Sequence, residues 1–167
     1  MTTPMTTPGV RTPTVVVTHS AEETRDFAAA LGAVARAGDR IALVGPLGAG
    51  KTQFAKGFAA GLGVREVVNS PSFTLMAEYA GRLPLFHQDL YRLNGAEETL
   101  AGGLVDERGL EGVTLTEWAE RFPSSLDRER LTVRFDVLSD DERQISLEAS
   151  TPRHGRYLRA AQSWWAR

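Results

Sequence analysis

Short apolar and alternating segments recur along the chain and predict β-strands. Residues 41–44 are apolar at every position, which is typical of a strand buried on both faces of a sheet. Residues 131–137 and 144–149 alternate on either side of the polar stretch 139–142, and this pattern predicts a hairpin. Further short strands are predicted at residues 15–18, 75–79, 83–87 and 113–116.

Helical signals stand between and after these strands. Ser20 is a predicted N-cap, with Glu23 completing a capping box, and this helix is expected to run to about residue 37, before Gly38. A short helix is predicted at residues 97–101. A last helix near the C-terminus is expected to pack on the sheet, or else to dock a partner. One face of it carries Tyr157, Leu158, Ala161 and Trp165.

A glycine-rich loop joins the strand at 41–44 to a helix that begins near Lys51. Gly45-Pro46-Leu47-Gly48-Ala49-Gly50-Lys51-Thr52 matches the pattern Gly-x-x-x-x-Gly-Lys-Ser/Thr. Gly48 and Gly50 allow a tight turn whose N–H groups point inward, next to the positive end of the helix dipole. Lys51 is expected to reach the β and γ phosphates, and Thr52 to coordinate Mg²⁺. The pattern predicts a P-loop that binds a nucleoside triphosphate.

Composition narrows the possible functions. The chain has 167 residues, a net charge of −2 and no cysteine, so disulfides, zinc–cysteine sites and thiol catalysis are excluded. It has no basic excess of the kind that binds nucleic acid unaided. No apolar run approaches the ~20 residues of a membrane span, and no signal peptide is recognised, so we expect a cytoplasmic protein. The three histidines are far apart in the sequence, which argues against a histidine-rich metal site, and His87 is interpreted as a hydrogen-bonded structural residue.

The chain is expected to divide into a tail and one domain. Residues 1–13 are rich in threonine and proline, repeat Met-Thr-Thr-Pro, and are predicted to be disordered. Residues 14–167 are predicted to form a single P-loop ATPase domain with a C-terminal helix.

Two acidic residues follow predicted strands. Asp89 comes after residues 83–87, and Glu117 comes after residues 113–116. Nucleotide hydrolysis needs a carboxylate near the end of a neighbouring strand to hold the metal or its waters. Asp89, Glu117 and Thr52 are therefore candidate metal ligands, and Asp89, Glu117 and Lys51 are candidate catalytic residues.

Three segments after the loop are more specific than the loop itself. They read Ser-Pro-Ser-Phe-Thr-Leu at 70–75, His-Gln-Asp-Leu-Tyr-Arg-Leu at 87–93 and Glu-Trp at 117–118. In this order they resemble the bacterial TsaE (YjeE) family over about residues 18–137. That family is the ATPase component of the machinery that makes threonylcarbamoyladenosine in tRNA.

The resemblance implies roles for the matching residues, with ATP or ADP and Mg²⁺ as cofactors. Asp89 matches a functional aspartate, and Glu117 matches a magnesium-associated glutamate. Residues 70–74 match a mobile segment near the γ-phosphate, and residues 20–23 match a segment near the base. The implied nucleotide-binding residues are Ser20, Glu23, Gly45, Pro46, Leu47, Gly48, Ala49, Gly50, Lys51, Thr52, Gln53, Thr74 and Trp118.

The resemblance also implies how the protein works. It implies slow hydrolysis alone and activity within a complex of TsaD and TsaB type proteins, with tRNA contacted only indirectly and no membrane involved. The implied fold is a three-layer α/β P-loop NTPase, with a mixed, mostly parallel sheet and antiparallel strands at the C-terminal end.

Two alternatives remain open. A small-molecule kinase could use Asp89 as a base. Such enzymes usually have an arginine-rich lid, and the nearest arginine cluster is Arg128, Arg130 and Arg134. However, Arg130 lies at the start of a predicted strand and Arg134 lies within it. A non-enzymatic switch could order residues 70–74 around the γ-phosphate. The sequence has no Asn-Lys-x-Asp motif of the kind that reads guanine, which favours ATP over GTP.

Overall fold

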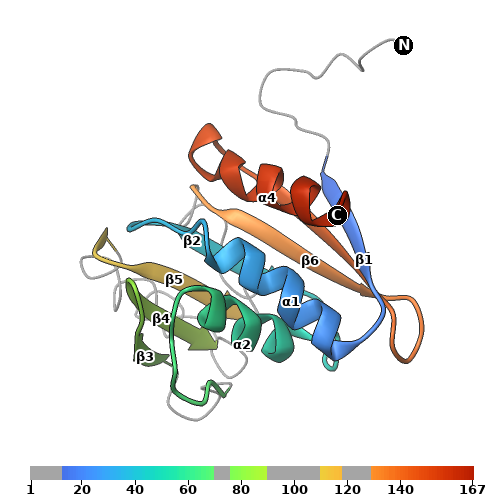
Figure 1. The fold of residues 1–167 in the computed structure, drawn as a ribbon, viewed down its shortest axis with the longest axis horizontal. Coiled ribbons are helices and arrows are strands. Elements are labelled where there is room, and N and C mark those ends of the chain that lie inside the picture. Colours follow the sequence, from blue (N-terminus) through green and yellow to red (C-terminus); the bar gives the residue numbers. More distant parts are fainter. Residues whose placement is uncertain (1–12, 70–75, 90–109, 118–128) are drawn as a thin grey trace, which may run out of the picture.

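The computed structural model describes residues 13–69, 76–89, 110–117 and 129–167 (Figure 1). Within them, seven strands form one sheet in the order β1-β7-β6-β2-β5-β4-β3. The strands are β1 (Thr14–Thr18), β2 (Arg40–Val44), β3 (Met76–Ala80), β4 (Pro84–Asp89), β5 (Val113–Glu117), β6 (Leu131–Val137) and β7 (Arg143–Ala149). The helices are α1 (Ala21–Gly32), α2 (Lys51–Gly61) and α4 (Gly155–Trp165), and a short 3-10 helix, η4 (Pro152–His154), precedes α4.

The sheet is parallel in its centre and antiparallel at both edges. Strands β6, β2, β5 and β4 run parallel to one another. The β6–β7 hairpin and β1 add antiparallel strands on one side, and β3 pairs antiparallel with β4 on the other. The predicted α/β class and mixed sheet are confirmed, and each predicted strand lies within a residue or two of the observed one.

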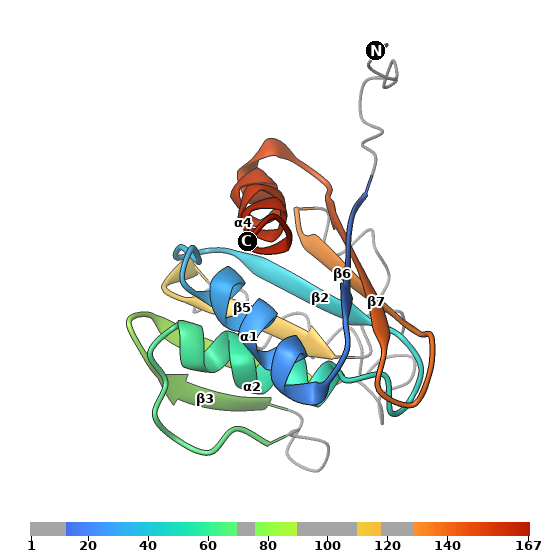
Figure 2. The same ribbon diagram turned by 45° about the vertical axis from the view of Figure 1, so that its right-hand side comes forward.

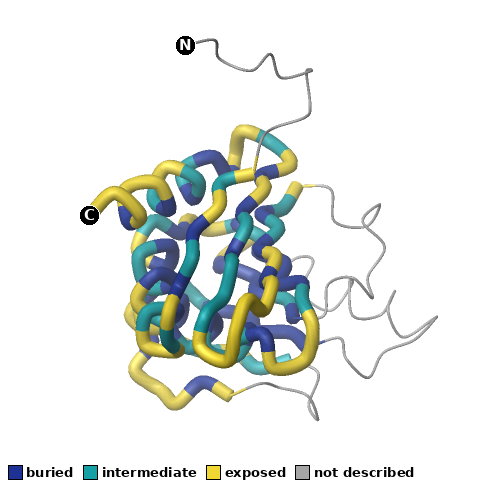
Figure 3. The backbone as a smooth tube through the Cα atoms, turned by 90° about the vertical axis from the view of Figure 1, so that its right-hand side faces the viewer, coloured by how far each residue is buried: buried dark blue, intermediate teal, exposed yellow. Residues whose placement is uncertain are grey.

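The three helices of the described residues lie along one face of the sheet (Figures 1 and 2). The Phe27 ring of α1 contacts Phe54 of α2 and Trp164 of α4, with ring centroids 6.3 and 5.0 Å apart. These residues belong to one continuous core, and exposed residues gather at the turns (Figure 3). Ala42 and Val44 are buried apart from this core. The described residues do not test the predicted third layer, and the helix predicted at 97–101 lies outside them.

Helices α1 and α2 pack closely because glycines stand where they meet. A Cβ atom on Gly57 would lie 2.2 Å from the carbonyl oxygen of Arg25, and one on Gly61 would lie 2.1 Å from that of Ala29. The Arg25 guanidinium donates a hydrogen bond of 2.6 Å to Oε1 of Gln53. Residues near the start of α1 thus contact residues near the start of α2, so the two N-termini lie at the same end of the molecule.

Helix α1 ends five residues earlier than predicted. Its N-cap is confirmed, since Ser20 Oγ accepts a hydrogen bond of 3.0 Å from the Glu23 N–H. The Glu23 carboxylate, however, contacts the His19 ring at 3.2 Å. Past Gly32, the Asp39 carboxylate accepts from the backbone N–H of Arg36 at 2.8 Å and fixes a turn. A local side chain thereby competes with helical hydrogen bonding, so residues 33–37 do not extend the helix.

The buried side of α4 differs by one residue from the predicted side. Tyr157, Ala161 and Trp164 are buried, Leu158 is partly buried, and Trp165 is 52% exposed. The prediction that Trp165 packs on the core is therefore wrong. Residues 157, 161 and 164 lie on the side of the helix that faces the core, and the indole of Trp164 donates a hydrogen bond to Asp26 of α1. Among the described residues, no helix has the length and apolar character needed to cross a membrane.

Candidate functional site

The predicted site segments meet at the carboxyl ends of the parallel strands. The glycine-rich loop at residues 45–52 leaves the end of β2, and Asp89 and Glu117 are the last residues of β4 and β5. In the sheet register Glu117 stands next to Leu43 on one side and Asp89 on the other. The carboxyl ends of parallel strands are where ligands bind in sheets of this type.

Backbone conformation explains two glycines of the loop. Gly48 and Gly50 have φ angles of 78° and 100°, a region that residues with a Cβ rarely adopt. Neither has an atom within 4 Å of a built Cβ, so the requirement is conformational rather than one of space. Gly50 is also the N-cap of α2, so the backbone N–H groups of the first helical turn point toward the loop.

Lys51 lies folded back against the loop. Its side chain is largely buried, with the residue 5% exposed, and Nζ donates a hydrogen bond of 2.6 Å to the carbonyl oxygen of Gly45. A buried ammonium group beside the N-terminus of a helix makes this end of the sheet attractive to an anion.

Arg143, at the start of β7, holds the loop from outside. Its Nε and Nη2 atoms donate hydrogen bonds of 3.2 Å to the carbonyl oxygens of Ala49 and Gly48. Its Nη1 donates to three carbonyl oxygens of the β6–β7 turn: Ser139, Asp140 and Glu142. Sequence reasoning missed this residue because it lies 94 positions from Ala49 and belongs to no motif.

Glu117 is oriented by His87. Both side chains are buried, at 3% and 0% exposed, and His87 Nε2 lies 2.6 Å from Glu117 Oε2. Since a carboxylate only accepts, the imidazole N–H donates, and the expected hydrogen-bonded role of His87 is confirmed. Side chains alternate along a strand, so His87 and Asp89 share the face of Leu85, and Glu117 that of Leu115. Both leucines belong to the core beneath α1 and α2.

Of the predicted metal ligands, Asp89 and Glu117 stand side by side in the sheet register, and Thr52 lies in the first turn of α2. Within the described ranges, no group of three or more histidine, aspartate or glutamate side chains is arranged to hold a metal ion. Mg²⁺ commonly takes one or two carboxylates and completes its shell with phosphate oxygens and water. Glu117, Asp89 and the Thr52 hydroxyl fit that donor set.

The remaining predicted residues are placed as follows. Ser20 is the N-cap of α1, and Glu23 lies in its first turn. The neighbouring His19 ring lies 3.6 Å from Glu142 of the β6–β7 turn. The next residue, Arg143, contacts the glycine-rich loop. Gln53, in the first turn of α2, is bound by Arg25. Thr74 and Trp118, with the segment 70–74, lie outside the described residues.

Comparison with known proteins identifies the family. Residues 18–145 match the family model described as threonylcarbamoyl adenosine biosynthesis protein TsaE. The chain belongs to the TsaE family. A TsaE protein of Bacillus subtilis is 46% identical over 79% of this chain and 83% of its own length, and one of Treponema pallidum is 40% identical over 78% and 97%.

A solved structure has the same fold. The crystal structure of Bacillus subtilis YdiB superposes with a TM-score of 0.76 at 37% sequence identity, covering 92% of this chain and 98% of that one. The resemblance inferred from residues 70–75, 87–93 and 117–118 is therefore confirmed, and the chain belongs to a family of tRNA threonylcarbamoyladenosine biosynthesis.

Proposed function

We propose that this chain is the cytoplasmic ATPase component of tRNA threonylcarbamoyladenosine biosynthesis. The observation that carries the proposal is the loop at 45–52, with Lys51 folded into it and two buried carboxylates at the same sheet edge. The loop N–H groups and the N-terminus of α2 would bind the triphosphate, and Lys51 would exchange the Gly45 carbonyl for phosphate oxygens.

The acidic residues fit a metal-assisted site. Thr52 and Glu117 would hold Mg²⁺, and Asp89 would join its shell or position water. When bound, the ion would neutralise charge on the phosphates. His87 would hold the Glu117 carboxylate in one orientation, as outer partners of metal ligands do.

Hydrolysis by the chain alone would be slow. Arg143, an arginine that contacts the loop, donates to loop carbonyl oxygens and so is committed away from phosphate. An arginine aimed at the transferred phosphate commonly raises such rates by about 10³-fold or more. We infer that TsaD and TsaB type proteins complete the site, and that tRNA is held by them.

The test is phosphate release with Mg²⁺–ATP, measured for the chain alone and with TsaD and TsaB type proteins added. We expect slow release alone, faster release in the mixture, and tighter binding of ATP than of GTP. Co-purification with and without ATP would show whether the partners bind in a nucleotide-dependent way. Tighter binding of GTP would overturn the assignment of the base.

The positions of Arg130 and Arg134 do not support the kinase alternative, which would need a mobile arginine-rich lid. Arg134 lies within β6, and Arg130 immediately precedes that strand, at the end opposite to the loop. Arg128 lies outside the described residues. A phosphorylated acceptor in a metabolite screen would nevertheless favour a kinase.

Arg143→Ala is expected to weaken ATP binding about tenfold. The substitution removes two hydrogen bonds that hold the loop in its shape. A hydrogen bond to a charged group contributes about 1.5–3 kcal/mol, and we expect part of this energy to appear as weaker ATP binding. Calorimetric titration measures the effect, with Arg65→Ala, an exposed arginine after α2, as the control. Unchanged affinity in Arg143→Ala would show that the loop keeps its shape without this contact.

A further inference from the structure

A positively charged pocket lies at the end of β2 that is opposite to the glycine-rich loop. Its volume is about 400 Å³, and its lining includes Arg36, Arg153, Arg156, Arg159 and Asp39. Asp39 immediately precedes β2, whereas the glycine-rich loop follows the other end of that strand. Five strand residues span roughly 16 Å, so a ligand here would be separate from one in the loop.

The pocket is strongly positive. Four arginines and one aspartate give its lining a formal charge of +3, in a chain whose net charge is −2. Burial lowers the pKa of the adjacent His154, so this imidazole is neutral and accepts a hydrogen bond of 3.2 Å from the Arg40 N–H. The positive charge therefore comes from guanidinium groups, which remain charged at every ordinary pH.

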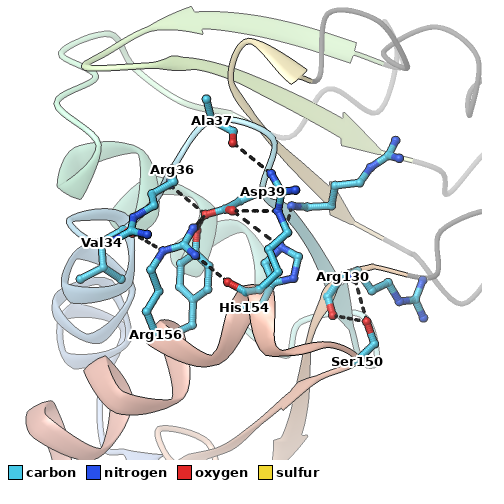
Figure 4. Close-up of polar contacts among 11 residues, drawn as sticks. Val34, Arg36, Ala37, Asp39, Arg130, Ser150, His154 and Arg156 are labelled. Carbon is cyan, nitrogen blue, oxygen red and sulfur yellow. Dashed lines mark hydrogen bonds and ion pairs between the residues drawn. The ribbon is translucent and has the colours of Figure 1, made fainter. Parts of the chain in front are cut away.

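Asp39 and Arg156, which both line the pocket, are joined in one network of polar contacts (Figure 4). Asp39 Oδ2 accepts from the Arg36 N–H at 2.8 Å, from the Tyr157 hydroxyl at 2.5 Å and from the Arg156 guanidinium. Burial and the Asp39 charge raise the pKa of Tyr157 far above its usual range, so its hydroxyl stays protonated and donates. Arg156 also donates to the carbonyl oxygens of Val34 and Arg153, at 2.9 and 2.6 Å.

The other arginines leave donors for a ligand. The Arg36 and Arg159 guanidinium groups make no hydrogen bond or ion pair with the part of the chain that the structure describes, and both residues are exposed. Arg153 is 42% exposed, and it donates to the Ala37 carbonyl while its Nε lies 3.8 Å from Asp39.

Helix stability does not account for this arrangement. Arg153, Arg156 and Arg159 follow at three-residue spacing around the start of α4, whose first turn contains no acidic residue. Cations at a helix N-terminus oppose the helix dipole, and Asp39 offsets only one of the charges.

We propose that this pocket binds the phosphate group of a second ligand, distinct from the nucleotide of the glycine-rich loop. Guanidinium forks match phosphate oxygens in pairs, and the volume holds more than one phosphate group. The phosphate belongs either to a small phosphorylated compound or to an RNA backbone that the partner proteins hold and this pocket touches. The proposal does not depend on ATP hydrolysis at the loop.

The test is calorimetric titration of pyrophosphate into the full chain carrying Lys51→Ala, which weakens binding at the loop. One equivalent is expected to bind, and adding Arg36→Ala with Arg159→Ala should weaken binding at least about tenfold. Both positions are exposed and unpaired among the described residues, so folding should be preserved, which the thermal unfolding midpoint verifies. Arg65→Ala, an exposed arginine after α2, is the matched control and should bind like its parent.

Competition identifies the source of the phosphate. Displacement of pyrophosphate by tRNA would assign the pocket to an RNA backbone, and failure of tRNA to displace it would assign it to a small phosphorylated compound. The proposal is overturned if the Lys51→Ala chain binds no pyrophosphate, or if the double arginine substitution leaves binding unchanged.

Discussion

Lys51→Ala is expected to remove ATP binding from the measurable range of ordinary titrations. Lys51 is the cation of the glycine-rich loop, and its Nζ already lies over the loop at 2.6 Å from the Gly45 carbonyl oxygen. Hydrogen bonds to charged groups contribute about 1.5–3 kcal/mol each, so losing contacts to two phosphates weakens binding roughly 100- to 10,000-fold. Calorimetric titration with Mg²⁺–ATP checks this: the original chain should give a binding isotherm, and Lys51→Ala should give no measurable heat of binding.

Lys56→Ala is the matched control for this change. Lys56 belongs to the same helix but lies one turn beyond the loop, so its loss should leave ATP affinity within about twofold. If Lys51→Ala and Lys56→Ala bound ATP equally well, the loop would not be the phosphate site.

Glu117→Gln is expected to lower ATP hydrolysis about 100-fold while changing ATP affinity much less. The amide keeps the shape of the side chain but loses the charge that would hold Mg²⁺, and the effect of one electrostatic group on such a step is about 10²–10³-fold. Asp89→Asn should act in the same direction. Phosphate release and ATP binding, measured on the same preparations, separate the two effects.

Stability must be measured alongside, because the Glu117 carboxylate is buried against His87. Glu148→Gln, on an exposed site of β7, is the control and should hydrolyse ATP at the original rate. Equal hydrolysis rates in the original chain, Glu117→Gln and Asp89→Asn would remove both acids from the mechanism.

Local patterns were sufficient for the strands, the loop and the start of α1. The apolar run at 41–44 is β2, the alternation at 131–149 is the β6–β7 hairpin, and Ser20 caps α1. Each of these features depends on residues within a few positions of one another. The segment order that indicated the TsaE family is likewise a property of the sequence alone.

Distant contacts decided what the sequence could not show. Asp39, which fixes the turn after α1, is itself bound by Arg156, 117 residues away. Arg143 reaches the loop across 94 residues, and the His87–Glu117 pair spans 30. Trp164 rather than Trp165 is buried because Phe27 and Asp26 of α1 lie beside it. The spacing of residues along the sequence does not predict these contacts, because they depend on which strands and helices lie side by side in the fold.

The most direct measurement is a crystal structure of the chain with Mg²⁺ and a non-hydrolysable ATP analogue. We predict that the β and γ phosphates lie on the loop N–H groups and on Lys51 Nζ, with the ion beside Thr52 and Glu117. A triphosphate bound elsewhere, or a loop at 45–52 that makes no phosphate contact at saturating analogue, would contradict it.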